Sequence, residues 1–218
     1  MNRQLNFFLT FIYSLLAATA MTSQANSAIE IVDDAGSTIS LGQPAKRIIS
    51  LAPSLTELVY AAGAGDKLIG VVEYSDYPLE ATNLPVVGRF DLLDLERILQ
   101  LQPDLIVAWQ SGNPRASVAR LKQLGLTVYI AEPKKLESIP SLIEKLGELA
   151  GTEATAAIAI NQFKETYSAL RTEYGSKPLV KTFYQVWDVP LITSGGNELI
   201  NDIISLCGGS NIFAELQL

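Results

Sequence analysis

Short apolar runs and amphipathic stretches alternate along the first part of the chain. The runs predict strands at residues 47–51, 68–72, 104–109 and 126–130. The run at 104–109 is almost wholly apolar, as expected of a strand buried on both faces of a parallel sheet. The stretches between and after the runs predict helices at residues 53–63, 94–101, 114–124 and 136–149. This alternation is typical of an open parallel sheet wrapped by helices.

Two local signals add detail to this pattern. Residues 29–41 alternate weakly around an Asp-Asp-Ala-Gly-Ser turn and predict a hairpin or arm ahead of the first sheet strand. Ser54, followed three residues later by Glu57, predicts a capping box at the start of the first helix.

The longest periodic stretch is residues 152–175, where Ala156, Ile160, Phe163, Tyr167, Leu170 and Tyr174 recur at steps of three and four. This spacing predicts one helix with one apolar stripe, roughly 30 Å long. Thr152 suits the N-cap, and Gly175 with Pro178 suits the end. The helix is either a rigid spacer between two lobes or an ordinary surface helix of a single α/β domain.

After this helix the alternation restarts, with strands predicted at 179–186 and 191–193 and a helix at 197–206. One strand–helix pair cannot bury both faces of a sheet. The predicted fold is therefore α/β, with two Rossmann-like lobes joined by one long rigid helix and the second lobe incomplete. The boundaries are residues 29–150 for the N-terminal lobe, 151–175 for the helix and 176–218 for the start of the C-terminal lobe.

Residues 1–28 have the features of a signal peptide: Arg3, an apolar run over 7–18 and small residues near 18–28. The run is too short for a membrane span, so we expect secretion, and the periplasm of a Gram-negative cell fits. The only cysteine, Cys207, is far from the cleavage region and cannot be a lipid acceptor there. It is either a small buried residue at the last helix or half of a disulfide whose other half lies outside this chain.

Composition excludes several classes of function. The net charge of −7 argues against nucleic acid or an anionic membrane as the main partner. The chain contains no histidine, which excludes Ser-His triads and the usual zinc hydrolase sites. No metal site is predicted.

Aromatic residues follow the predicted strands, where open parallel sheets bind ligands. Tyr74, Phe90, Trp109 and Trp187 all lie in such loops. Wide apolar side chains suit a large, flat ligand, although each could instead cap the end of the sheet. Asp76 and Asp91 could act as an acid–base pair in a small secreted α/β hydrolase, but loop aspartates more often make turns.

Several segments resemble the periplasmic vitamin B12-binding proteins of cobalamin ABC importers, which belong to the helix-linked (class III) periplasmic binding protein superfamily. The resemblance rests on the Arg-Ile-Ile-Ser-Leu-Ala-Pro-Ser-Leu-Thr-Glu-Leu segment at 47–58, Tyr-Ser-Asp-Tyr-Pro at 74–78, the Asp-Leu-Glu-Arg-Ile and Gln-Pro-Asp-Leu-Ile segments at 94–98 and 102–106, Ala-Trp with Gly-Asn at 108–113, Thr-Ser-Gly at 193–195, Cys-Gly-Gly at 207–209 and Asn-Ile-Phe at 211–213. It covers about residues 47–213. The first segment and the Pro-Asp-Leu strand are shared with haem and siderophore carriers of the same fold.

The resemblance implies a corrinoid held between two lobes and no catalysis, with no catalytic cofactor. It places Tyr74, Phe90 and Trp109 against the ligand, with Pro53 touching it. In the second lobe, Val186 occupies the directly matching position, and its neighbour Trp187 is the aromatic candidate there.

The resemblance also implies a partner, an ABC importer permease in the inner membrane, and a monomeric carrier. Arg115 stands where a docking glutamate is expected. Relatives continue for about half a lobe more, including a cysteine that pairs with Cys207. The alternative ligand is haem or a ferric siderophore.

Overall fold

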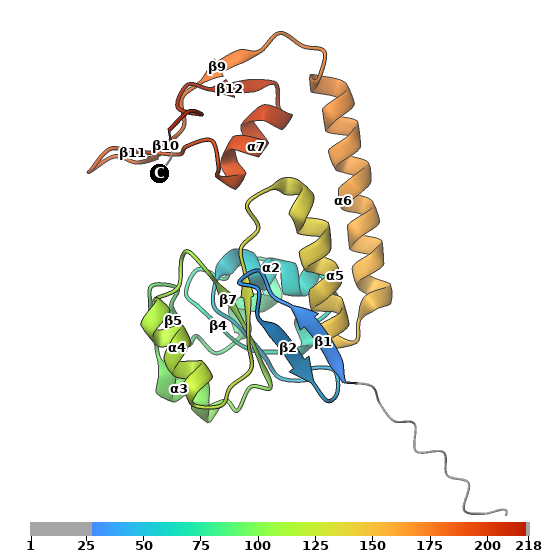
Figure 1. The fold of residues 1–218 in the computed structure, drawn as a ribbon, viewed down its shortest axis with the longest axis vertical. Coiled ribbons are helices and arrows are strands. Elements are labelled where there is room, and N and C mark those ends of the chain that lie inside the picture. The colour runs from blue at the N-terminus through green and yellow to red at the C-terminus, as the bar shows by residue number, and fades with distance from the viewer. Residues whose placement is uncertain (1–27, 217–218) are drawn as a thin grey trace, which may run out of the picture.

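The computed structural model describes residues 28–216, so the predicted signal peptide (1–28) lies outside the described residues except for its last position. The chain forms a first lobe, one long helix that rises from it, and a smaller second part above the lobe (Figure 1). Within residues 28–216, no helix is both long and apolar enough to span a bilayer.

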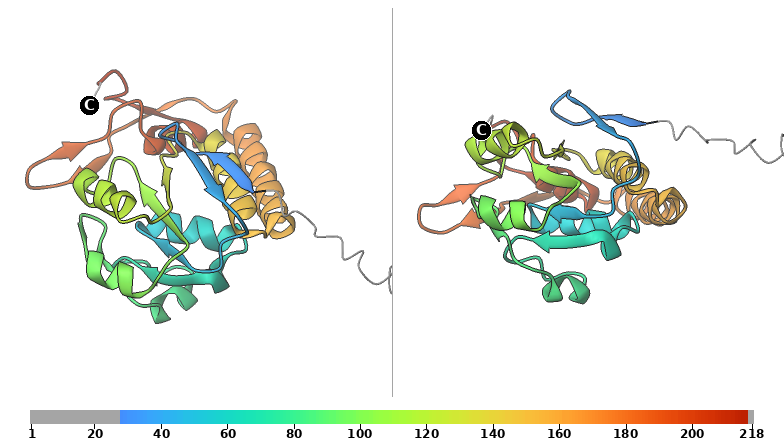
Figure 2. Two further views of the ribbon diagram at one scale, coloured as in Figure 1. Left: turned by 60° about the horizontal axis from the view of Figure 1, so that its bottom comes forward. Right: turned by 90° about the horizontal axis from the view of Figure 1, so that it is seen from below.

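A four-stranded parallel sheet forms the centre of the first lobe. Its order is β4 (Leu68–Val71), β3 (Ile48–Ser50), β7 (Leu105–Trp109) and β8 (Val128–Ala131), and every neighbouring pair is parallel (Figure 2). These are the four strands that the sequence predicted. The α/β class and the open parallel sheet are therefore confirmed.

Helices cover both faces of this sheet. Alternate residues of β7 point to opposite faces, so Leu105 packs in one apolar cluster and Ile106 in the other. The first cluster lies under α2 (Pro53–Ala61) and α5 (Ile139–Ala150), and the second lies under α3 (Leu95–Gln100) and α4 (Arg115–Gln123). Burial on both faces explains why the strand sequences are apolar throughout.

An antiparallel hairpin, β1 (Ile29–Val32) and β2 (Thr38–Leu41), covers the outer edge of the sheet, as the predicted arm. The Asp33 carboxylate accepts from the amides of Ala35 and Ser37 within the turn and from Ile130 of β8 at 3.3 Å. The Asp34 amide donates to the Ile130 carbonyl at 2.9 Å. These bonds satisfy part of the edge of β8, which would otherwise be open to pairing with another chain.

Short elements complete the first lobe: the 3-10 turns η2 (Gly65–Lys67), η3 (Leu79–Asn83) and η4 (Leu136–Ser138), and a small antiparallel pair, β5 (Gly88–Arg89) and β6 (Leu92–Leu93). The capping box predicted at Ser54 and Glu57 is wrong. Helix α2 begins at Pro53, as predicted, but its N-cap is Ala52 and it has no side-chain cap bond. Proline suits a first helical position because its missing N–H has no partner there anyway.

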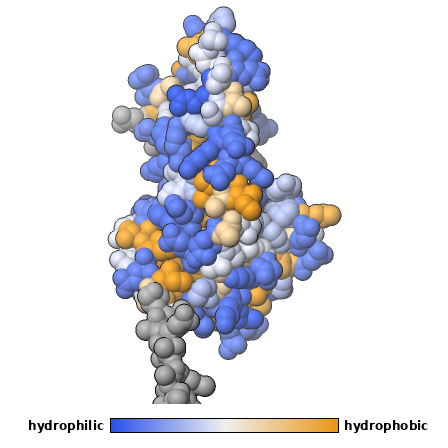
Figure 3. Space-filling model, turned by 90° about the vertical axis from the view of Figure 1, so that its right-hand side faces the viewer, coloured by the Kyte–Doolittle hydropathy of each residue, from blue (hydrophilic) through white to orange (hydrophobic). Residues whose placement is uncertain are grey.

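The predicted long helix is α6 (Glu153–Tyr174), with Thr152 and Gly175 at its two caps. Its apolar stripe is confirmed: the six residues of the stripe and Ala159 are the members of the helix that are not exposed. The opposite side is mostly hydrophilic, with one apolar patch about halfway up (Figure 3). The Thr152 hydroxyl does not cap the helix but donates to the Ala62 carbonyl at 2.6 Å, which ties α6 to the end of α2.

The second part is a β-α-β unit with a hairpin. β9 (Val180–Thr182) pairs in parallel with β12 (Gly209–Asn211), and α7 (Leu199–Leu206) connects to β12. The single strand predicted at 179–186 is wrong, because the chain breaks at residues 183–184 and continues as β10 (Gln185–Trp187), paired with β11 (Ile192–Thr193). Here one run of apolar residues serves two different sheets.

Besides α6, polar contacts join the second part to the first lobe. The Asp202 carboxylate on α7 accepts from the Lys135 ammonium at 2.9 Å and from the Leu136 amide at 3.2 Å. In addition, α6 itself is bonded to the first lobe, because the Tyr167 hydroxyl donates to Glu137 in η4.

Tyr129 of β8 is a buried residue whose hydroxyl has no hydrogen-bond partner among the described residues. Burial raises the pKa of this hydroxyl, with smaller contributions from the nearby carboxylates of Asp34 and Asp33, so it stays neutral. A buried, unpaired hydroxyl costs free energy relative to the same ring without it.

We therefore expect Tyr129→Phe to unfold at an equal or higher denaturant concentration, with a gain in unfolding free energy of up to about 1 kcal/mol. Urea denaturation followed by circular dichroism measures this. Tyr129→Leu is the control, because it removes the ring as well and should destabilise. A clear loss of stability in Tyr129→Phe would mean that the hydroxyl has a partner, such as a buried water.

Protection from amide exchange should fall along α6. Ala156, at 1% exposure, packs against α5 at Gly147, whereas Leu170 and Tyr174 are only half-buried. Hydrogen exchange followed by mass spectrometry should show slower exchange around 156–160 than around 167–171. Uniform protection along the helix would contradict this expectation and would mean that the second part holds α6 as firmly as the first lobe does.

Candidate functional site

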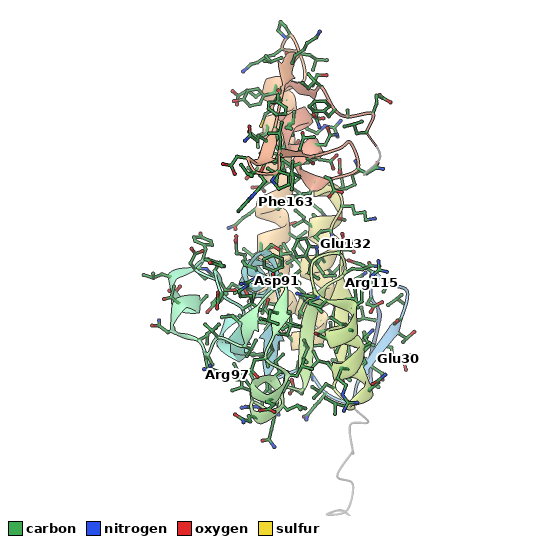
Figure 4. All side chains as sticks on the ribbon, turned by 90° about the vertical axis from the view of Figure 1, so that its left-hand side faces the viewer. Glu30, Asp91, Arg97, Arg115, Glu132 and Phe163 are labelled. Carbon is green, nitrogen blue, oxygen red and sulfur yellow. The ribbon has the colours of Figure 1, made fainter. Side chains whose placement is uncertain are left out.

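The strand order creates a switch point at the carboxyl ends of β3 and β7. The chain passes from β3 to its neighbour β4 on one side, then returns to β7 on the other side of β3. Ligands of open parallel sheets bind at this reversal. Asp91, in the turn between β5 and β6, and Arg115, the first residue of α4, lie at the end of the lobe nearer the second part, and Arg97 lies at the opposite end (Figure 4).

Phe90 and Trp109 meet at this switch point. Trp109 is the last residue of β7, Phe90 lies in the turn between β5 and β6, and their ring centroids are 6.1 Å apart at an interplanar angle of 45°. Aromatic rings prefer such tilted contacts at 4.5–7 Å to a face-to-face sandwich. Gly112 makes room for the indole, because a Cβ there would lie 1.8 Å from the Trp109 ring.

Tyr74 and Pro53 lie on the neighbouring loops of the same lobe. Pro53 is the half-buried first residue of α2, directly after β3. Tyr74 is 75% exposed and has a positive φ of 67°, which is uncommon for a non-glycine residue. Its loop is anchored on both sides: the Glu73 amide donates to the Gly88 carbonyl at 2.9 Å, and Ser75 Oγ lies 3.2 Å from Thr56 Oγ1 of α2.

Trp187 is on the second part, in β10, and is 59% exposed. The ring pairs within residues 28–216 join Phe90 to Trp109 but do not include Trp187 or Tyr74. The structure therefore brings two of the four predicted aromatic residues into contact. The role of all five predicted residues in binding a ligand stays a prediction.

Asp76 and Asp91, the candidate acid–base residues, have different surroundings. The Asp91 carboxylate accepts two hydrogen bonds from the Arg89 guanidinium, at 2.9 and 2.5 Å, and this pairing holds the pKa of Asp91 below its usual value. A carboxylate held ionised in this way is a poor general acid. Asp76 is an exposed loop residue with no such partner among the described side-chain bonds.

Arg115 and Cys207 are two further residues that the sequence singled out. Arg115 is the first residue of α4, and with Trp109, Lys122 and Ile130 it lines a pocket of about 270 Å³. Cys207 is exposed at the end of α7, so the expectation that it is a small buried residue is wrong. The question of a disulfide partner is not tested.

Asn113 lies at the centre of the switch point, although the sequence alone did not predict a role for it. Its side chain is 4% exposed, between the loops that follow β3 and β7 and the turn that carries Phe90. A buried amide in a loop is a signal that no local pattern reveals. The sequence offered two hints: Asn113 belongs to the Gly-Asn segment that carries the family resemblance, and it directly precedes Pro114, the N-cap of α4.

Comparison with known proteins agrees with this architecture. The sequence profile described as periplasmic binding protein matches residues 48–217. The chain belongs to the periplasmic binding protein family. The family resemblance expected from the sequence is thereby confirmed, and proteins of this family are named for binding rather than for catalysis.

The individual relatives are named for two ligands, vitamin B12 and heme. The chain is 44% identical over 175 residues to the vitamin B12-binding protein of Vibrio cholerae, covering 80% of this chain and 63% of that protein. It matches the crystal structure of the periplasmic vitamin B12 binding protein of Vibrio cholerae with a TM-score of 0.75 at 44% identity, covering 80% of this chain and 69% of that one. A periplasmic heme-binding protein from Roseiflexus sp. RS-1 matches with a TM-score of 0.69 at 25% identity, covering 79% and 68%. The chain thus spans under two thirds of the curated relative's length.

Gly112→Ala should displace the Trp109 ring, since the added methyl group meets indole atoms at 1.8 to 2.4 Å. We expect a shifted Trp emission maximum and a loss of unfolding free energy of about 1–3 kcal/mol, the usual cost of overpacking. Fluorescence and urea denaturation measure the two effects. Gly42→Ala is the matched control, because a Cβ there meets no atom within 4 Å. Unchanged emission in Gly112→Ala would mean that the indole does not pack on this loop.

Proposed function

We propose that this chain binds cobalamin, or a closely related corrinoid, at the aromatic surface beyond β3 and β7. The observation that carries the proposal is the Phe90–Trp109 pair at the switch point, in a chain that is 44% identical to a vitamin B12-binding protein. A corrin is a wide, mostly apolar ring system, which suits aromatic side chains on the protein.

The residues have distinct proposed roles. Trp109 and Phe90 provide the apolar surface for one side of the ligand, and the exposed ring of Tyr74 extends that surface on the neighbouring loop. Pro53 contacts the ligand at the start of α2. Trp187 contacts it from the second part, whose exposed β10 carries this indole. Binding would need only burial of these surfaces and ordering of their side chains, with no proton transfer.

The proposed biological role is delivery rather than chemistry. We infer that the protein is a monomeric carrier without catalytic activity. It works in the periplasm after removal of the signal peptide and delivers its ligand to an ABC importer permease in the inner membrane. The family supports the carrier role. A hydrolase that used Asp76 and Asp91 is less well supported, because Asp91 is already paired with Arg89.

Haem is the second candidate ligand, because the fold is shared with a solved heme-binding protein at 25% identity. Haem iron is usually held by His, Cys, Met or Tyr. The chain has no histidine, so the exposed Tyr74 is the candidate axial ligand in the first lobe. Corrinoid binding needs no such ligand from the protein, and the higher identity of the vitamin B12-binding relative favours it.

Calorimetric titration with cyanocobalamin, haem and a ferric siderophore tests the proposal. We expect cyanocobalamin to bind tightest, and Trp109→Ala to weaken it by about tenfold or more, since truncating a central aromatic contact costs 1.4 kcal/mol or more. Val32→Ala, an exposed apolar change in the β1–β2 arm, is the control and should bind as the parent does.

Unchanged cobalamin affinity in Trp109→Ala would contradict the proposal that the ligand stacks on Trp109. Tighter binding of haem, lost in Tyr74→Phe, would favour the haem carrier instead. Turnover of an ester or glycoside panel that disappears in Asp76→Asn would support the hydrolase.

A further inference from the structure

We propose that Asn113 is the positioning residue of the candidate site: its side-chain amide holds the Phe90 turn and the Trp109 loop in one fixed geometry across the switch point. The inference rests on the proposed function, since Phe90 and Trp109 matter as a pair only if a ligand lies against them. Asn113 itself does not touch the ligand in this proposal.

The geometry is that of a three-way bridge. Asn113 Nδ2 donates to the Leu51 carbonyl and to the Phe90 carbonyl, each at 2.8 Å. Asn113 Oδ1 accepts from the Trp109 amide at 2.6 Å. The backbone amide of Asn113 donates to the Trp109 carbonyl at 3.0 Å, which closes the loop on itself.

The chemistry of the bridge requires an amide side chain of this length. Asparagine has two N–H donors on one atom and an acceptor on the other, and both donors and the acceptor are used here. An aspartate would set carboxylate oxygens against two carbonyl oxygens, with no donor for either when ionised. Because the site is 4% exposed, water cannot readily replace the lost bonds.

The three backbone groups that Asn113 contacts belong to the loops that carry the candidate residues. Leu51 directly follows β3, two residues before Pro53, and the other two groups belong to Phe90 and Trp109 themselves. The Phe90 turn is tied toward β4 through Gly88, whose carbonyl accepts from the Glu73 amide at 2.9 Å, and Asn113 ties it toward β3 and β7. The Arg89–Asp91 bond in the same turn is exposed and does not reach the sheet.

The chain contains a matched control for this role. Asn211, at 5% exposure, bridges two backbone groups in the second part: its Nδ2 donates to the Ser194 carbonyl at 3.0 Å, and its Oδ1 accepts from the Phe213 amide at 3.0 Å. Replacing it removes a comparable buried bridge without touching the loops of Phe90 and Trp109. A general loss of packing and a specific loss of positioning can therefore be separated.

The test is ¹⁹F NMR of the protein labelled with 5-fluorotryptophan, which gives one signal each for Trp109 and Trp187, assigned with Trp187→Phe. In the ligand-free protein, Asn113→Asp should shift or broaden the Trp109 signal, and Asn211→Asp should leave it in place. The Trp109 signal of Asn113→Asp should move back toward the parent position as the pH falls, because a protonated carboxyl regains one donor. Cyanocobalamin affinity should fall about tenfold or more in Asn113→Asp and much less in Asn211→Asp.

An unchanged Trp109 signal in Asn113→Asp, or an equal shift in Asn211→Asp, would overturn the proposal. If Asn113→Asp does not fold, Asn113→Ser, which keeps one donor, decides: a folded protein with a displaced Trp109 signal supports positioning. Unfolding of both variants would overturn it, since Asn113 would then hold the lobe together instead. If no corrinoid binds the parent, the proposed function fails, while the ligand-free spectra still decide whether Asn113 positions the two rings.

Discussion

The parallel pairing of β3 with β7 positions the loops that form the candidate site. Ile48 lies opposite Leu105 and Ser50 opposite Val107, although the two strands are separated in sequence by β4 and α3. This register sets the two strand ends side by side, and the loops that follow them form the switch point. Everything proposed about ligand binding depends on this adjacency, because Pro53 follows one strand and Trp109 ends the other.

The two parts of the molecule differ in how completely they bury their apolar surface. The first lobe has an apolar cluster on each face of its sheet and a hairpin along one edge. The second part leaves many large apolar residues exposed, Leu179, Val180 and Val189 among them. Its connections to the first lobe are α6 and the contacts of Asp202 with Lys135 and Leu136. The free energy of folding therefore resides mainly in the first lobe, which also carries most of the candidate site.

The candidate site shows which kinds of residue a sequence can reveal. Phe90 and Trp109 stood out because large aromatic side chains in strand-end loops are unusual as simple connectors, and the structure places them in contact. Asn113 did not stand out, since a loop asparagine most often makes a local turn. Its importance comes from bonds to Leu51 and Phe90, which lie 62 and 23 residues away along the chain.

The α/β class, the four strands, the arm and the limits of the long helix could all be predicted from the sequence, because each depends on periodicity and end signals within about twenty residues. The sequence failed where neighbouring elements decide the outcome: the N-cap of α2, which is Ala52, and the break between β9 and β10. The exposure of Cys207 contradicts one of the two alternatives that the sequence left open. The strand order, and with it which loops meet at the switch point, became known from the fold. Strand order depends on pairing between distant segments, and no local pattern of apolar residues encodes it.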